Sequence, residues 1–155
     1  MTPAGAELAA RDIPHREFTH PGPVRSLEQA AAERGQDPAQ VVRSIIFHIT
    51  EGEYVLVLAG GPRQIDWGAL RRRLGVSRMR MATPEEVLEV TGFEIGAVGP
   101  FGLPRPIRTL VDRGLIDQSE VSIGSGVRGT TVFIKTEELI GALGDVEWLR
   151  SNADV

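Results

Sequence analysis

Cysteine is absent from the 155 residues, and lysine, histidine and aromatic side chains are scarce. Without cysteine the chain has no disulfide framework, no thiolate zinc site and no cysteine nucleophile. Lys135 is the only lysine among the 17 basic residues, so a catalytic lysine can be no other residue. Aromatic residues make up 5% of the chain, which limits any platform on which nucleobases stack.

Long apolar runs are also absent. No segment approaches the ~20 consecutive apolar residues that span a bilayer, and residues 1–11 lack the basic stretch and apolar core of a secretory signal. We therefore expect a cytoplasmic protein without a membrane partner. The three histidines, His15, His20 and His48, do not have the spacing of a metal site, so we expect neither a metal nor another cofactor.

Length and composition predict one globular domain over residues 1–155, with residues 1–12 as a loose leader. Apolar residues make up 41% and charged residues 25% of the chain, which is close to the globular average. The net charge of −4 excludes a uniformly basic surface for nucleic acid, although it allows a local basic patch.

Strand and helix signals follow one another irregularly along the chain. β-Branched residues predict strands, and capping residues such as Ser26 and Thr83 predict helix starts. The predicted strands are 13–19, 41–49, 54–59, 77–81, 107–112, 120–124 and 130–135, and the predicted helices are 27–34, 67–74, 84–92 and 137–143, the last capped by Thr136. Because no regular βαβ alternation appears, we predict an α+β domain with a mixed sheet.

Arg43 lies in a predicted strand, where it shares a face with Ile45, Phe47 and Ile49. A cation in phase with large hydrophobic residues is costly unless it is paired or lies at the mouth of a pocket. Two interpretations stay open. Arg43 either extends to water or to an internal carboxylate at the strand end, or it faces a ligand.

Two glycine-rich segments are candidate pocket walls. The first is Gly92–Gly102, in which glycine allows a ligand to approach the backbone and proline stiffens the loop. Such a loop can direct amide N–H groups at a carbonyl oxygen or an oxyanion, although a plain connecting loop is the alternative. The second, Gly124–Gly129, is either a tight hairpin or a second pocket wall.

A basic segment lies in the middle of this acidic chain, with Asp66 as the only acid within it. It suits phosphate groups, and a solvated helix face is the alternative. Its arginines are Arg63, Arg71, Arg72, Arg73, Arg78 and Arg80. Asp112 lies at a predicted strand end, where it either forms a turn or lines a pocket.

Taken together, these segments resemble the YbaK/ProX family of aminoacyl-tRNA deacylases, which is related to the editing domain inserted in bacterial prolyl-tRNA synthetases. The similarity extends from about residue 18 to residue 143. The segments that carry it are His20-Pro21-Gly22-Pro23-Val24, Val41–Phe47, Ala82–Val87 with Thr91-Gly92-Phe93, the G-x-x-x-P loop Gly96–Pro100 with its continuation to Pro104, Val111-Asp112 and Gly124-Ser125-Gly126.

The resemblance implies a curved mixed β-sheet, a partial barrel, with flanking helices and a small pocket. It also implies hydrolysis of the ester between a mischarged amino acid and the 3′ end of tRNA, by water or by a group of the substrate and without a metal. The implied partners are the acceptor end of aminoacyl-tRNA and an aminoacyl-tRNA synthetase.

The resemblance also implies where the reaction takes place. We expect the reaction centre to comprise Arg43, Gly96, Ala97, Val98, Gly99 and Pro100. We expect the substrate to contact Phe18, His20, Ile45, Phe47, Phe101, Asp112, Gly124, Ser125 and Gly126, and we expect tRNA to contact the arginines of the basic segment.

Arg43 stands where the family typically has a pocket lysine. Arginine keeps the positive charge but does not act as a general base, because it cannot lose its proton at working pH. A trans-editing deacylase is therefore our first hypothesis. The second is an aminoacyl-tRNA-binding module whose reaction is weakened or lost, and the third is an interaction protein with an idle pocket.

Overall fold

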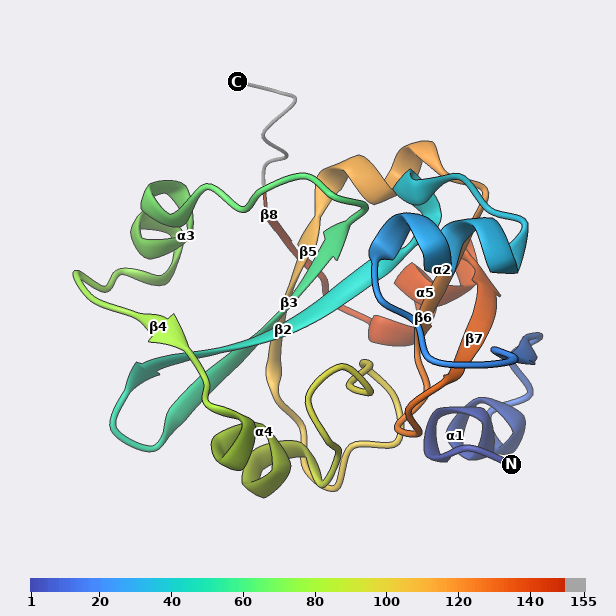
Figure 1. Ribbon diagram of the computed structural model, residues 1–155. Coiled ribbons are helices and arrows are strands. Elements are labelled where there is room, and N and C mark those ends of the chain that lie inside the picture. Colours follow the sequence, from blue (N-terminus) through green and yellow to red (C-terminus); the bar gives the residue numbers. More distant parts are fainter. Residues whose placement is uncertain (150–155) are drawn as a thin grey trace.

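The computed structural model describes residues 1–149, in which two β-sheets are surrounded by five α-helices (Figure 1). This arrangement confirms the predicted mixed α+β class. The sheets do not close into a barrel. One has five strands and the other three, and a single parallel bridge between Val41 and Ser122 joins them.

The larger sheet has the strand order β4-β2-β3-β5-β8. Its centre is the antiparallel hairpin of β2 (Val42–Thr50) and β3 (Glu53–Gly60), and β4 (Arg80–Met81) pairs with the outer side of β2. On the other side, β5 (Arg108–Asp112) and β8 (Glu147–Leu149) add in parallel. The sheet is therefore mixed, as the irregular order of elements predicted.

The smaller sheet has the order β1-β7-β6 and is antiparallel throughout. It consists of β1 (Arg16–Thr19), β7 (Thr130–Lys135) and β6 (Glu120–Gly124). Strand β6 faces the start of β2, so the ends of the two sheets meet, and residues of both strands line a cleft there.

The helices are short, and local sequence explains most of their ends. Ser26, Asp66 and Thr83 each accept a backbone hydrogen bond at a helix start, and Gly35 and Gly75 end helices with left-handed backbone conformations. The α-helices are α1 (Pro3–Ala10), α2 (Leu27–Arg34), α3 (Trp67–Leu74), α4 (Pro84–Thr91) and α5 (Thr136–Leu143), and the 3₁₀ helices are η1 (Pro38–Gln40) and η2 (Arg113–Asp117).

The prediction of a loose leader over residues 1–12 is wrong. Helix α1 occupies most of this segment, and Ala4 and Leu8 are completely buried in the core. The Ala4 amide donates a 3.0 Å hydrogen bond to the Ser125 carbonyl, which ties the helix to the β6–β7 turn. A helix this short has too few apolar positions to show a periodic pattern in the sequence. It is stabilised mainly by its tertiary contacts, which the sequence does not show.

Three smaller predictions also need correction. Thr136 is the first residue of α5 and makes no side-chain cap hydrogen bond, so it is not the predicted cap. Of the predicted strand 77–81, only Arg80 and Met81 form a strand, which is β4. Strand β8 was not predicted, because a segment of three residues carries too little pattern to be recognised.

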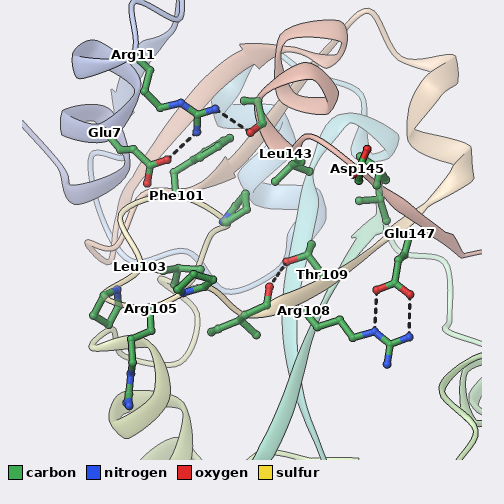
Figure 2. A pocket seen from close by; sticks show the side chains of 17 residues that line it. Glu7, Arg11, Phe101, Leu103, Arg105, Arg108, Thr109, Leu143, Asp145 and Glu147 are labelled. Carbon is green, nitrogen blue, oxygen red and sulfur yellow. Dashed lines mark hydrogen bonds and ion pairs between the residues drawn. The ribbon is translucent and has the colours of Figure 1, made fainter.

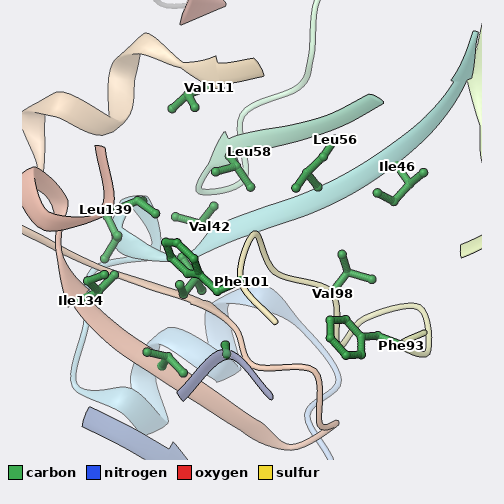
Figure 3. Close-up of a cluster of buried hydrophobic side chains, with 14 of the residues drawn as sticks. Val42, Ile46, Leu56, Leu58, Phe93, Val98, Phe101, Val111, Ile134 and Leu139 are labelled. Carbon is green, nitrogen blue, oxygen red and sulfur yellow. The ribbon is translucent and has the colours of Figure 1, made fainter. Parts of the chain in front are cut away.

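Two hydrophobic clusters lie on opposite faces of the larger sheet. The first contains Val42 and Ile46 of β2 and packs them against Phe101 and residues of both sheets (Figure 3). The second contains Phe47 of β2 together with Leu70 of α3. Strand β2 thus buries side chains on both of its faces, which explains why the three apolar residues Ile45, Ile46 and Phe47 follow one another at its centre.

The closest packing in the site region joins two backbones. A Cβ on Gly99 would lie 2.0 Å from the Gly124 carbonyl oxygen, and a Cβ on Gly124 would lie 2.0 Å from the Val98 oxygen. The Gly126 amide also donates a 2.8 Å hydrogen bond to Ala97 O. Glycine is required at both crossing positions because any side chain would separate the two segments.

Substitution of Gly99 tests this contact. We expect Gly99→Ala to lower the free energy of unfolding by about 1–3 kcal/mol, because the added methyl group overpacks a backbone contact. Urea denaturation measures this change. Gly141→Ala is the control, since Gly141 lies in α5 with nothing within 4 Å of an added Cβ, and it should be neutral or stabilising by up to about 1 kcal/mol. Equal effects of the two substitutions would contradict the contact.

An ion pair and a helix cap meet at Glu86, at the start of α4. Its carboxylate accepts hydrogen bonds from Arg80 at 2.6 and 3.0 Å, from the Thr83 amide at 2.8 Å and from the Tyr54 hydroxyl at 2.9 Å. The Arg80 and Thr83 hydrogen bonds hold the pKa of Glu86 far below its usual range. A depressed carboxyl pKa stabilises the fold above the unfolded-state value of about 4.3, and this contribution is lost as the pH falls below it.

We therefore expect Glu86→Gln to lower the melting temperature at pH 7 and to approach the wild type as the pH falls below about 4. Glutamine keeps the capping geometry but removes the charge. Glu85→Gln is the control, because Glu85 lies in the same first turn and has no ion pair within residues 1–149. A difference between Glu86→Gln and wild type that stays constant from pH 7 to pH 2 in thermal scans would disprove the assignment.

Candidate functional site

A cleft with a volume of about 820 Å³ lies where the two sheets meet. Its walls are α2 and the segment before it, the start of β2, the loop around Gly96, and the β6–β7 region. Among residues 1–149, four arginines line the cleft and no aspartate or glutamate does. The arginines are Arg25, Arg34, Arg43 and Arg128. A cleft with this charge favours an anionic ligand.

The predicted glycine-rich loop forms one wall of this cleft through Gly96 and Val98. Gly96 has a positive φ of 89°, which turns the backbone at this point. Within residues 1–149, the amide N–H groups of Gly96 and Val98 donate no hydrogen bond. Two unused backbone donors on either side of Ala97 are suited to bind an oxygen atom that carries negative charge.

Arg128 holds this loop from outside. Its Nη2 and Nε donate to the Ile95 carbonyl oxygen at 2.9 and 3.2 Å, and its guanidinium also pairs with Glu94 at 3.2 Å. Together with the contact between Gly99 and Gly124, these bonds connect the loop to the β6–β7 turn at several points. The loop is therefore preorganised, as a binding site made of amides requires.

Arg43 also lines the cleft, but its side chain is engaged by the backbone. Its Nε donates to Gly61 O at 2.8 Å, and one terminal nitrogen donates to Arg63 O. Burial lowers the pKa of the Arg43 guanidinium, and the nearby Asp112 carboxylate opposes this shift. Two of the three guanidinium nitrogens thus hold the segment that follows β3.

A polar network connects α2 with the smaller sheet. His20 Nδ1 lies 2.7 Å from Glu33 Oε1, while Arg34 Nε donates to His20 Nε2 at 3.0 Å and Arg34 Nη1 donates to Ser122 Oγ at 2.9 Å. Hydrogen bonds from Gln29 and His20 lower the pKa of Glu33. Burial lowers the pKa of Arg34, and the Glu33 charge opposes this shift.

Sequence reasoning identified His20 in this network but missed Arg34 and Ser44. An arginine in the last turn of a helix is ordinary, so Arg34 gives no local signal. Ser44 lines the cleft, and its Oγ is buried with no hydrogen-bond partner within residues 1–149. Only the meeting of α2, β2 and β6 reveals these two side chains as neighbours of the predicted site.

Several predicted substrate contacts lie elsewhere. Ile45 and Phe47 pack in the hydrophobic cluster beneath α3, on the other face of β2 from the first core cluster, and they do not line the cleft. Phe18 lies edge-on to His20, with ring centroids 5.1 Å apart, behind the cleft wall. Pro100 and Phe101 line the second cleft instead.

Asp112 and Ser125 maintain local structure. Asp112 accepts from the Gly60 amide at 3.1 Å and the Gly114 amide at 2.9 Å, and it pairs with Arg63 at 3.3 Å. Ser125 is buried, and its hydroxyl donates to Thr130 O at 2.6 Å within the β6–β7 turn. Neither residue lines the cleft. The remaining predicted residues, Ala97, Gly99 and Gly126, form the layer behind it.

The arginines of the basic segment divide into paired and unpaired groups. Arg63, Arg73 and Arg80 pair with Asp112, Glu147 and Glu86, at 3.3, 3.8 and 2.6 Å respectively. Within residues 1–149, no carboxylate lies within 4.0 Å of the other three guanidinium groups, which are those of Arg71, Arg72 and Arg78. This surface belongs to α3 and the following loop, and α3 lies across the β2–β3 hairpin from α2 (Figure 1).

The second cleft has a volume of about 470 Å³ and lies between α1, the loop after Phe101 and β8 (Figure 2). Six charged residues of the described chain line it, and four of them form ion pairs with one another. Arg108 makes two hydrogen bonds to Glu147, at 2.7 and 2.8 Å, and Arg11 pairs with Glu7 at 2.9 Å. Because these charges are neutralised within the protein, this cleft is a weaker candidate for an anionic ligand.

Two further features are absent from the described residues, 1–149. They contain no helix that is long and apolar enough to cross a membrane. They also contain no group of three or more His, Asp or Glu side chains that could hold a metal ion.

Comparison with known proteins reveals relatives of two sizes. The proline–tRNA ligase of Thermosipho melanesiensis is 35% identical over 109 residues, which are 70% of this chain but 19% of that protein. The uncharacterised protein YwhH of Bacillus subtilis is 33% identical over 114 residues, covering 74% of this chain and 72% of that one. The chain thus spans about a fifth of the length of the proline–tRNA ligases that it matches.

Solved structures extend the likeness to nearly the whole chain. A protein described as a candidate trans-editing enzyme for prolyl-tRNA synthetase has a TM-score of 0.87 and 30% identity, with 96% of this chain and 94% of that one covered. The hypothetical protein APE2540 has a TM-score of 0.85 and 27% identity, with coverages of 94% and 97%. Since the family model for the aminoacyl-tRNA editing domain also matches residues 21–142, which include all of the residues that line the cleft except His20, this chain belongs to the aminoacyl-tRNA editing domain family.

Proposed function

We propose that this protein hydrolyses the ester bond of mischarged aminoacyl-tRNA, acting in trans on tRNA that a synthetase has released. The observation that carries the proposal is a pair of amides, those of Gly96 and Val98, that donate to no residue in 1–149 and lie on a cleft to which the same residues contribute four arginines and no acid. The family and the relatives described as prolyl-tRNA synthetase or its trans-editing enzyme support the same substrate class.

The proposed reaction is addition of water to the ester carbonyl of the aminoacyl group. The carbonyl oxygen then becomes an oxyanion, and the amides of Gly96 and Val98 bind it. Collapse of the tetrahedral intermediate breaks the bond to the ribose oxygen, which takes up the proton that the added water gives up. The products are the free amino acid and tRNA with a free 3′ end. No side chain of the cleft is required as a nucleophile.

Arg43 contributes structure and charge in this proposal. By donating to Gly61 O and to Arg63 O, it connects the start of β2 with the segment after β3. Its charge adds to that of the other cleft arginines and favours an anionic substrate. Because a guanidinium does not act as a general base at working pH, Arg43 does not activate the water molecule.

A panel of mischarged tRNAs tests the proposal. We expect the wild-type protein to hydrolyse at least one of them about 10²-fold or more faster than the protein-free rate, the order contributed by a single oxyanion donor. Release of the amino acid from labelled aminoacyl-tRNA measures the reaction. Rates that equal the protein-free rate for every tRNA in the panel would reject hydrolysis.

The second candidate is a module that binds aminoacyl-tRNA without cleaving it. One observation favours it. Arg43 donates to two carbonyl groups, so only one of its three guanidinium nitrogens is left to contact the substrate. Arg43→Lys distinguishes the two candidates. A deacylase should keep its activity within about tenfold, since the charge remains. If the wild type binds aminoacyl-tRNA and only Arg43→Lys cleaves it, the binding module is correct.

The unpaired arginines of α3 and its following loop are the proposed contact for the tRNA backbone. We expect the triple variant Arg71→Gln, Arg72→Gln and Arg78→Gln to bind tRNA more weakly at low salt. The slope of log affinity against log salt concentration should fall by about 0.7–0.9 for each phosphate that the variant no longer neutralises. Filter binding across a salt series measures both quantities.

The control for this variant removes equal charge from elsewhere on the surface. It carries Arg16→Gln, Arg105→Gln and Arg113→Gln, all at exposed positions outside the basic segment and outside the cleft. A control that loses as much affinity and slope as the α3 variant would assign the effect to net charge rather than to this surface.

A further inference from the structure

Arg34 differs from the other cleft arginines because it is braced by side chains yet lacks an acidic partner. Nε donates to His20 Nε2 at 3.0 Å and Nη1 donates to Ser122 Oγ at 2.9 Å. Its remaining nitrogen, Nη2, makes no hydrogen bond to any residue in 1–149, and no carboxylate in this range lies within 4.0 Å of the guanidinium. This half-buried cation therefore keeps a donor available on a residue that lines the cleft.

His20 explains why Glu33 does not neutralise Arg34. A guanidinium only donates hydrogen bonds, so His20 Nε2 must accept from Arg34, and the imidazole proton lies on Nδ1. That proton is donated to Glu33 Oε1, 2.7 Å away, while Gln29 Nε2 donates to Glu33 Oε2 at 2.8 Å. Both carboxylate oxygens are thus occupied, and the neutral imidazole separates the acid from the guanidinium.

The other arginines of the cleft do not share these properties. Arg43 is held by two carbonyl groups, and Arg128 pairs with Glu94. Arg25 is exposed, so water solvates its charge. Burying a charge without a counter-ion is costly. Arg34 is nevertheless held in place by its hydrogen bonds. A bound anion would therefore gain more binding free energy at Arg34 than at the other three arginines.

The sheet sets the distance from Arg34 to the glycine-rich loop. Ser122, which holds the guanidinium, and Gly124, which contacts the loop, are two residues apart on β6 and share a face. Two residues of a strand span about 7 Å. One nucleotide therefore has the length to place its 3′ ester at the amides of Gly96 and Val98 and the phosphate on its 5′ side at Arg34.

From this geometry we propose that Arg34 binds the phosphate on the 5′ side of the terminal adenosine of tRNA, with His20 and Ser122 as its positioning residues. The proposal rests on the proposed function, because it assumes that the aminoacylated end enters this cleft. It names the anion that the positive charge of the cleft would attract, which is this phosphate. It also adds a binding residue that sequence patterns did not reveal.

Direct binding tests the assignment without requiring hydrolysis. Adenosine 5′-monophosphate and adenosine are titrated into the wild type, Arg34→Gln, Arg34→Lys and Arg105→Gln, with binding followed by NMR chemical shifts. We expect the wild type and Arg105→Gln to prefer the phosphate by roughly 10- to 100-fold, the range for a hydrogen bond to a charged group. Arg34→Gln should lose this preference and keep its affinity for adenosine, and Arg34→Lys should keep part of the preference.

Three results would overturn the proposal: equal affinities of the wild type for the two ligands, an unchanged phosphate preference in Arg34→Gln, and an equal loss in Arg105→Gln. If Arg34→Gln fails to fold, as judged by its thermal transition, Ser122→Ala replaces it in the same binding titrations. This variant keeps the Arg34 cation but removes the hydrogen bond from Nη1 to Ser122 Oγ. It should therefore reduce the phosphate preference several-fold. An unchanged preference in Ser122→Ala would then reject the assignment.

Hydrolysis of two model esters separates this proposal from the proposed function. The 3′-aminoacyl esters of adenosine 5′-monophosphate and of adenosine differ only in the phosphate. If Arg34→Gln slows cleavage of the first ester and not of the second, both proposals stand. A phosphate preference in binding without cleavage of either ester would reject the deacylase and keep the Arg34 assignment. Equal slowing of both esters would reject Arg34 as the phosphate contact.

Discussion

The backbone contact between Gly99 and Gly124 is the constraint on which the site depends. Neither residue can carry a side chain there, because a Cβ on either would lie 2.0 Å from a carbonyl oxygen of the other segment. The contact brings the glycine-rich loop onto the end of β6, and the Gly126 amide secures it with a hydrogen bond to Ala97 O. Amides whose positions are set by neighbouring backbone need no reorganisation when charge develops nearby, which is the property an oxyanion site requires.

The charges of the cleft form a second, complementary constraint. The part of the chain that the structure describes contributes no acidic residue to its walls, while arginines approach from α2, β2 and the β6–β7 turn. His20 illustrates how the fold maintains this imbalance. As a neutral imidazole it accepts from Arg34 and donates to Glu33, so an acid and a base that are adjacent in sequence do not neutralise each other. A chain with a net charge of −4 thus carries a locally positive cavity.

Local signals in the sequence predicted much of the fold. β-Branched residues predicted β2, and the capping residues Ser26 and Thr83 begin helices as predicted. Sequence placed Arg43 on the face of Ile45 and Phe47, and its side chain donates to carbonyl groups of the segment that follows β3, at the strand end. The hydrophobic pair was predicted to contact substrate, but α3 covers it. Alternation identifies which residues share a face, whereas it does not identify what packs against that face.

Sequence by itself determined the mixed α+β class, the family resemblance and the two glycine segments, because these depend on local propensity and on the order of motifs along the chain. Tertiary structure alone decided that residues 3–10 form a packed helix, that Pro100 faces a second cleft, and that Arg34 belongs to the site. The physical reason is the same in each case. A cavity is formed by segments that are distant in sequence, and the hydrogen bonds that orient its side chains join residues as far apart as Arg34 and Ser122.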